Sequence, residues 1–159
     1  MRRPLTEIGP RFVEMAHGIG IAVAATTNRK GQPRTRVMQP VWDWDGGAVT
    51  GWASTSTEAP KLAHLRRIPS LSLTYWNAEQ DTCTADCDVA IIADDDERAW
   101  RRFLATPPPA GLDPAIHPEW ESPASPTFGV VRLCPHWLRV MPGTLMTQGT
   151  GEVWTWRRP

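Results

Sequence analysis

The sequence predicts a mainly β protein: an antiparallel β-barrel, closed or split, with peripheral helices. Short segments with apolar or alternating side chains recur along the 159-residue chain, as expected for the strands of a barrel. The connections between successive segments are short, and this favours antiparallel pairing because a parallel pair needs a longer crossover. The length fits one domain over residues 1–159, and no segment repeats another.

The first half of the chain is expected to contain two helices and three strands. A helix over residues 4–17 places Ile8 and Phe12 roughly on one face, and Gly9-Pro10 either splits it or marks its start. The elements that follow are strands over residues 19–27, 34–44 and 48–53, then a helix from about Thr57, its expected cap, to Arg67.

The second half is expected to contain strands around one more helix. Leu71, Leu73 and Tyr75 alternate with polar residues, which is the pattern of a half-buried strand. The acidic run 94–97 opens a helix in the orientation that the helix dipole favours. The remaining expected strands cover residues 82–93, 128–133, 137–140 and 149–156, with a break at Pro135.

Residues 106–126 form a long proline-rich segment with little periodicity. A structureless excursion of this length is usually either functional or disordered. Its apolar residues Leu112, Ile116 and Trp120 predict an ordered segment that packs on the barrel or on a second subunit and shapes the substrate side of a pocket. The candidate polar contacts in this segment are His117 and Glu119.

Charge and hydropathy argue against two classes of partner. Lys and Arg together number 17, as do Asp and Glu, so no net field favours nucleic acid. No apolar run approaches the length of a membrane span, and the start of the chain does not resemble a signal peptide. A reducing cytoplasm is the simplest compartment for three cysteines without a disulfide pattern.

The cysteines raise the alternative of a zinc site. Cys83, Cys87, Cys134 and His136 offer four soft ligands, and the first spacing is allowed for zinc. However, Cys83 and Cys87 fall on an expected strand, where four residues separate them by about 13 Å at ~3.3 Å per residue. We therefore expect buried free thiols and no metal.

The candidate binding site combines Arg36, Thr55 and Lys61. Two expected strands and a hairpin bring Arg36 and the hydroxyl cluster around Ser54 towards the helix that carries Lys61. Arginine offers a planar fork to two phosphate oxygens, lysine adds a point charge, and hydroxyls supply neutral donors. The alternative is that Arg36 pairs with an acidic residue and Lys61 is a solvated helix residue.

These residues occur in an order that resembles a known family. The matching elements are Arg36-Val37-Met38, Thr55, Lys61, Ile68-Pro69, the strand 71–76, and the late strand 129–133 with Pro135. In this order they resemble the pyridoxamine 5′-phosphate oxidase-like family of FMN-binding split β-barrels. The resemblance implies an antiparallel split barrel over roughly residues 18–140.

The resemblance also implies a cofactor and an assembly. Arg36 and Lys61, with Thr55 or Ser54, would hold the phosphate of FMN. The backbone from Arg36 through Val37, Met38 and Gln39 to Pro40 would face the flavin ring, and Trp52, Trp154 or Trp156 would cover it. The implied protein is a homodimeric oxidoreductase that moves hydride between FMN and a small molecule, with no identified catalytic residue.

The chain departs from the family pattern at two positions. Ala59 replaces the family's serine two residues before the lysine, and Ile68 replaces the asparagine before the proline. The C-terminal residues lack the Arg-x-His clamp of true pyridoxamine-phosphate oxidases, so that activity is not assigned. A deazaflavin-dependent reductase and a non-catalytic flavin or haem carrier or sensor remain alternatives. His64, on the same helix as Lys61, is either a proton donor facing the ligand or a surface residue.

Overall fold

The computed structural model describes residues 1–92, 96–111 and 113–159. In chain order the elements are α1 (Leu5–Ile19), β1 (Ala22–Thr27), β2 (Pro33–Met38), β3 (Val41–Trp44), β4 (Val49–Ser56), α2 (Pro60–Arg67), β5 (Ser70–Trp76), β6 (Thr82–Ile92), α3 (Asp96–Ala105), the 3-10 turn η1 (Pro114–Ile116), β7 (Phe128–Met141), α4 (Thr144–Gln148) and β8 (Trp154–Arg157). Among these residues, no helix has both the length and the apolar character needed to cross a bilayer.

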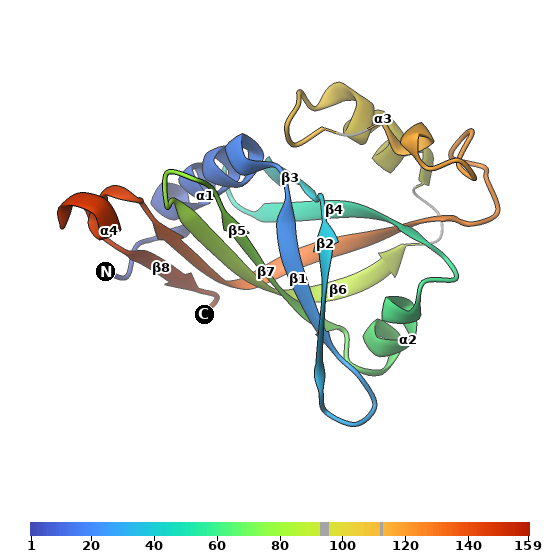
Figure 1. The fold of residues 1–159 in the computed structure, drawn as a ribbon, viewed down its shortest axis with the longest axis horizontal. Helices are drawn as coiled ribbons and strands as arrows, with labels where there is room; N and C mark the ends of the chain where they lie inside the picture. The colour runs from blue at the N-terminus through green and yellow to red at the C-terminus, as the bar shows by residue number, and fades with distance from the viewer. Residues whose placement is uncertain (93–95, 112) are drawn as a thin grey trace.

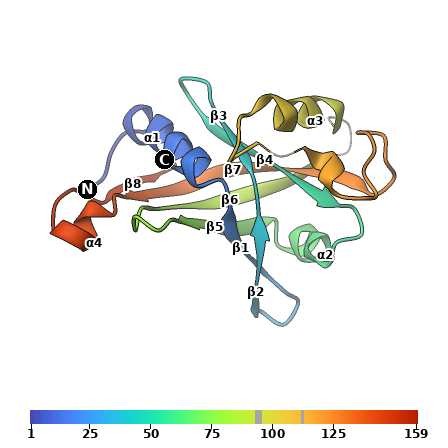
Figure 2. The ribbon, with the colours of Figure 1, turned by 45° about the horizontal axis from the view of Figure 1, so that its top comes forward.

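One curved antiparallel sheet forms the body of the molecule (Figure 1). Its strand order is β2-β1-β5-β6-β7-β4-β3, and β8 pairs with β7 outside this path. Helices α1, α2 and α3 lie around the sheet, and α4 lies with β8 at the end far from α2 (Figures 1 and 2). The predicted mainly β architecture with antiparallel strands and peripheral helices is confirmed.

The expected strand 34–44 is two strands. Pro40 has no N–H to donate to a ladder, and the chain breaks at Gln39-Pro40. As a result β2 pairs with β1 and β3 pairs with β4, at opposite ends of the strand order. Gln39 and Pro40 thus connect the two edge strands of the sheet, β2 and β3. These two strands are not neighbours in the strand order, so the barrel is split between them.

The expected break at Pro135 is wrong. β7 runs unbroken from Phe128 to Met141, and Pro135 lies opposite Cys87 where the register shifts between Asp86 and Cys87. A bulge is one of the few places in a sheet that accept a proline, because the ladder is already interrupted there. This single long strand pairs with β6, β4 and β8.

One helix prediction and one strand prediction also need correction. α2 begins at Pro60 with Ala59 as its N-cap residue, whereas the hydroxyl of Thr57 donates to the carbonyl of Pro126 at 3.3 Å. Pro60 suits the first helical position because its missing N–H would have no partner there anyway. The last expected strand, 149–156, starts only at Trp154, and a helix, α4, precedes it. α1 is one helix that continues through Pro10.

Seven of the nine tryptophans belong to two apolar clusters. Inside the barrel, the rings of Phe12 and Trp42 meet edge to face at 5.0 Å, and the indole of Trp42 donates to the hydroxyl of Tyr75 at 2.7 Å. The second cluster lies beneath α3, where Trp100 and Trp120 both meet Phe128 edge to face. Much of the indole load is therefore core packing.

Most of the segment 106–126 falls in the described part of the chain and packs on the barrel through Trp120, which is 6% exposed. Ile116 is 72% exposed and is not the anchor that was expected, while Leu112 lies outside the described residues. His117 stacks on Trp120 at 4.4 Å, and Glu119 accepts from Thr127. Both expected polar contacts therefore serve the segment itself.

Cys83 and Cys87 are buried free thiols, as predicted. Burial raises the pKa of both, so each remains protonated in the folded protein well into the alkaline range. Within the described ranges, no group of three or more acidic, histidine or cysteine side chains gathers at a metal-binding distance.

Candidate functional site

Arg36 and Lys61 meet at an open hollow of about 420 Å³ between β2 and the start of α2. We call it the basic hollow. The residues that line it are Arg34, Thr35, Arg36, Ala59, Pro60, Lys61 and His64. Of the charged side chains in this lining, each is basic and none is acidic. The hollow therefore offers positive charge to solvent without a carboxylate of its own to balance it.

The strand register explains how the arginine reaches the hollow. Arg36 lies opposite Ala24 and Arg34 lies opposite Thr26, so both arginines share the face of β1 that carries the buried residues Ala24 and Thr26. α2 packs against β1 and β6. Its apolar residues Leu62 and Leu65 turn towards the core. This leaves Lys61 and His64, one helical turn apart, at the edge of the hollow.

The two cations are partly withdrawn from water without compensation. One terminal nitrogen of Arg36, Nη1, is buried and has no hydrogen-bond partner among the described residues. Burial lowers the pKa of Arg36. Burial also lowers the pKa of Lys61, and the positive charge of Arg36 lowers it further. Both shifts mean that the charged forms are disfavoured here, and a bound anion would reverse this by supplying the missing counter-charge.

The two candidate hydroxyls do not line the basic hollow. Thr55 is 3% exposed, its hydroxyl lies 3.3 Å from the carbonyl of Ser56, and it lines a separate hollow with Leu62 and Phe128. Ser54 is half-buried on the opposite face of β4, because side chains alternate along a strand. The structure therefore brings together the arginine and the lysine of the predicted set, but neither hydroxyl.

The candidate ring-facing residues diverge. Val37 points to the outer face and is 67% exposed, whereas Met38 is buried in the barrel core. The side-chain amide of Gln39 donates to the carbonyl of Pro109 at 2.7 Å and so ties the chain after α3 to the sheet. Of Val37, Met38 and Gln39, only Val37 therefore has an exposed side chain.

The candidate indoles have partners within the protomer. Trp156 packs half-buried against the barrel core from β8, which lies at the opposite end of the molecule from α2 (Figure 1). Trp154 contacts two guanidinium groups, those of Arg3 and Arg11, each 4.8 Å from its ring. The indole N–H of Trp52 donates to Asp43.

His64 and Thr26 are the site features that sequence reasoning undervalued. The sequence leaves His64 as either a ligand-facing proton donor or a surface residue; in the structure it lines the basic hollow and its Nδ1 lies 3.0 Å from the hydroxyl of Thr26. A usable signal was present: His64 follows Lys61 by three residues, which places both on one side of a helix. Thr26 carried no such signal, because only the docking of α2 on β1 brings it to the histidine.

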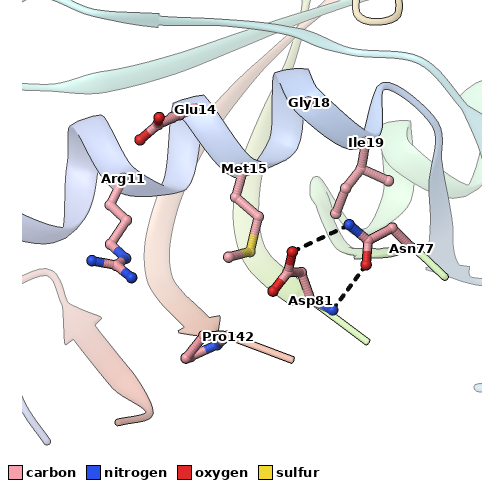
Figure 3. A pocket seen from close by; sticks show the side chains of 8 residues that line it. All are labelled: Arg11, Glu14, Met15, Gly18, Ile19, Asn77, Asp81 and Pro142. Atoms are coloured by element: carbon pink, nitrogen blue, oxygen red, sulfur yellow. Dashed lines mark hydrogen bonds between the residues drawn. The ribbon is translucent and has the colours of Figure 1, made fainter. Parts of the chain in front are cut away.

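Another hollow, of about 440 Å³, lies between α1 and the turn that joins β5 to β6 (Figure 3). Asn77 and Asp81 bond to each other across this turn, and Asp81 also accepts from the backbone N–H of Gly143. The remaining charges, Arg11 and Glu14, are of opposite sign. Asp81 is therefore committed to holding the turn, and because the lining has two carboxylates and one guanidinium this hollow is a poorer site for an anion.

Comparison with known proteins agrees with this geometry. The profile of the family described as pyridoxamine 5′-phosphate oxidase matches residues 8–141, which includes the basic hollow and the sheet around it. The chain belongs to this family. This confirms the family that the motif residues Arg36-Val37-Met38 and Lys61 suggested from the sequence. No curated protein matches the chain.

Solved structures show the same fold at low sequence identity. An FMN-binding, pyridoxamine 5′-phosphate oxidase-related protein from Nostoc punctiforme is 16% identical with a TM-score of 0.66, covering 99% of this chain and 92% of that one. A Clostridium acetobutylicum protein related to general stress protein 26 is 15% identical with a TM-score of 0.66, covering 96% and 94%. A NimC/NimA family protein from the same organism is 16% identical with a TM-score of 0.66, covering 92% and 91%. The fold is thus the split barrel of this family.

Proposed function

We propose that the protein is an FMN-dependent oxidoreductase whose basic hollow holds the phosphate of the cofactor. The observation that carries the proposal is the pair Arg36 and Lys61, two partly buried cations with an unpartnered guanidinium nitrogen and no acidic neighbour in the lining. A phosphate monoester carries about two negative charges near neutral pH and matches this pair. Family membership and the FMN-binding relative support the choice of cofactor.

The residues of this chain bind and orient the cofactor. Arg36 would present its planar fork to two phosphate oxygens, and Lys61 would add a compact charge from the first turn of α2. In that turn the backbone N–H of Lys61 is a further donor, because Pro60 has no N–H and the N–H of Leu62 already donates to the carbonyl of Ala59. When bound, the flavin supplies the hydride chemistry, and no protein side chain is required for that step.

A second copy of the chain is part of the proposal. The outer face of β1, β2 and β5 carries four exposed apolar side chains, which we call the apolar strip: Ile21, Val23, Val37 and Trp76. Val23 lies opposite Val37 in the register, and Ile21 precedes β1 on the side of Trp76. Apolar surface of this kind marks protein contacts. A partner subunit on this face would bury it and bring a second wall next to the strand that carries Arg36.

The experiment is to purify the protein and measure the mass and absorption spectrum of any small molecule that leaves with it. We expect FMN. The apoprotein should bind FMN more tightly than riboflavin, which lacks the phosphate, and a nicotinamide donor should reduce the bound flavin. Binding of both flavins with equal affinity would contradict a phosphate site at Arg36 and Lys61. Stable colour without turnover on any acceptor would indicate a carrier.

The unpaired thiols suit a reducing compartment, and we place the protein in the cytoplasm on that ground. Its proposed substrate is a small organic molecule rather than a nucleic acid, because positive charge gathers at one hollow while the chain as a whole is neutral.

A further inference from the structure

We propose that His64 is a third phosphate ligand in the basic hollow and that Thr26 holds its ring in position. Nothing in the family profile or in the relatives' descriptions assigns either residue. The proposal rests on the proposed function, because it takes the phosphate of FMN as the anion between Arg36 and Lys61. It deepens that function by adding a donor from the second turn of α2.

The geometry places the ring against β1 at the edge of the basic hollow, where it also borders a neighbouring hollow lined by Arg29 and Arg67. His64 borders the hollow one turn after Lys61, and its Nδ1 lies 3.0 Å from Oγ1 of Thr26 on β1. Nε2 is on the side of the imidazole away from Nδ1, and it has no hydrogen-bond partner among the described residues. One ring nitrogen is thus engaged with the barrel, and the other is available to a ligand.

Thr26 allows this nitrogen to be a donor in either charge state of the ring. A threonine hydroxyl can donate or accept. If it donates to Nδ1 of the neutral ring, the proton of the imidazole sits on Nε2; if the ring is charged, Nδ1–H donates to the hydroxyl and Nε2 again carries a proton. A phosphate in the hollow favours these two states, because it repels the Nε2 lone pair of the remaining tautomer.

The burial of Thr26 fits this role. Thr26 is 3% exposed, and its hydroxyl needs a partner because a buried polar group without one is costly. The bond to His64 supplies that partner and at the same time fixes the ring. A purely structural reading is that the same bond only tethers α2 to β1. The two readings differ at Nε2: a phosphate ligand needs a hydrogen bond from this nitrogen, whereas a tether between α2 and β1 does not.

The test is His64→Asn, with Thr26→Val and Lys61→Ala beside it. The asparagine amide occupies the position of Nδ1 and keeps the bond to Thr26, but it has no atom where Nε2 was. FMN and riboflavin affinities of each apoprotein are measured by fluorescence titration. We expect His64→Asn to weaken FMN binding roughly 10- to 100-fold, the range for a hydrogen bond to a charged group, and to leave riboflavin binding unchanged. Thr26→Val should weaken FMN binding less, since it frees the ring without removing Nε2.

A second readout follows the ring directly. In protein labelled with ¹⁵N-histidine, the Nε2 signal that disappears in His64→Asn should shift on addition of FMN but not of riboflavin. If His64→Asn binds FMN as the wild type does while Lys61→Ala loses FMN selectively, the phosphate site stands and His64 is only a tether. If Lys61→Ala leaves the preference for FMN intact, the proposed function fails together with this inference.

Discussion

Lys61 and Arg36 illustrate at the residue scale how the proposed binding site would lower the stability of the fold that carries it. Their charges are partly removed from water next to each other, and the described lining of the basic hollow offers them no carboxylate. Each charge costs free energy until a ligand compensates it. Such strained arrangements are typical of functional sites, where stability and binding make opposite demands.

The first prediction is that Lys61→Met stabilises the apoprotein but weakens FMN binding. Removing a disfavoured charge should raise the free energy of unfolding at pH 7 by about 0.5–1 kcal/mol, while the affinity for FMN falls roughly 10- to 100-fold. Urea unfolding without flavin and flavin titration measure the two effects. The other lysine, Lys30, is exposed, and Lys30→Met is the matched control that should change neither quantity.

The pH dependence gives the sign of the Lys61 effect. Because the folded state lowers the pKa of Lys61, the unfolded chain binds this proton more tightly. As the pH rises through the folded pKa towards the unfolded value of 10.5, the unfolding free energy of the wild type should therefore rise relative to that of Lys61→Met. The test compares the unfolding free energies of the two proteins rather than that of the wild type alone. The buried thiols of Cys83 and Cys87, whose pKa values are raised, destabilise both proteins equally at high pH, and the comparison cancels this effect. A constant difference across this range would show that Lys61 is fully solvated.

The second prediction concerns the hydrogen bond inside the barrel. Tyr75→Phe removes the acceptor of the indole N–H of Trp42 and leaves that donor buried without a partner. We expect a loss of about 1–3 kcal/mol in the free energy of unfolding, measured in urea at pH 7. Thr74→Val, which removes an exposed bond to Thr84, is the control and should change stability by less than about 0.5 kcal/mol. Equal effects of the two substitutions would mean that the buried bond contributes nothing.

At the scale of elements, α3 and the segment 106–126 act as one layer on β3, β4 and β7. Trp100 and Trp120 enclose Phe128, and Arg102 forms an ion pair with Asp43. The amide of Gln39 holds the carbonyls that follow α3. This layer is therefore fixed to the same stretch of chain, residues 36–40, that borders the proposed cofactor site.

The third prediction is that Trp120 anchors this layer. Trp120→Ala should lower the free energy of unfolding by about 3–5 kcal/mol and speed proteolytic cleavage within residues 106–126. Trp120→Phe should cost far less, since it keeps a ring against Phe128 and removes an indole N–H that is buried without a partner among the described residues. Urea unfolding and timed proteolysis measure both. Ile116→Ala is the control, because that side chain is exposed. Rapid cleavage of the wild type with FMN retained would show a loose connector instead.

At the scale of the whole molecule, the two faces of the β1–β2 hairpin have different chemistry. One face carries Arg34 and Arg36 towards α2, and the other carries the apolar strip. In a single protomer, the proposed cofactor site on this hairpin is open to solvent on its outer side. A partner subunit would close it, and this links assembly to cofactor binding.

The fourth prediction is that the protein is a homodimer held by the apolar strip. Light scattering at micromolar concentration should show a dimer, and Val37→Asp should give a folded monomer because it puts a charge in the centre of a desolvated contact. Met146→Asp, at an equally exposed apolar residue on α4, is the control and should remain dimeric. A wild-type monomer would contradict the assembly. A dimer unaffected by Val37→Asp would move the interface elsewhere.

Local patterns in the sequence were sufficient for most of the elements and for the proximity of Arg36 and Lys61 in the candidate site. Alternation in β5, the glycine-containing hairpin before β4 and the position of Lys61 at the start of α2 are local signals, and they predicted an antiparallel barrel with a phosphate-binding pair. The family motif joined Arg36 to Lys61 because it records their order along the chain.

Only the tertiary structure determined the rest, because these features depend on residues far apart in sequence. The route of β7 through Pro135 depends on a bulge in β7 opposite Asp86 and Cys87 of β6, and the exclusion of Thr55 from the basic hollow depends on which face of β4 meets α2. The bond between Thr26 and His64 joins residues 38 positions apart, and it forms only where α2 docks on β1. Side-chain direction in a sheet reverses with every residue, so packing decides which member of a hydroxyl cluster faces a ligand.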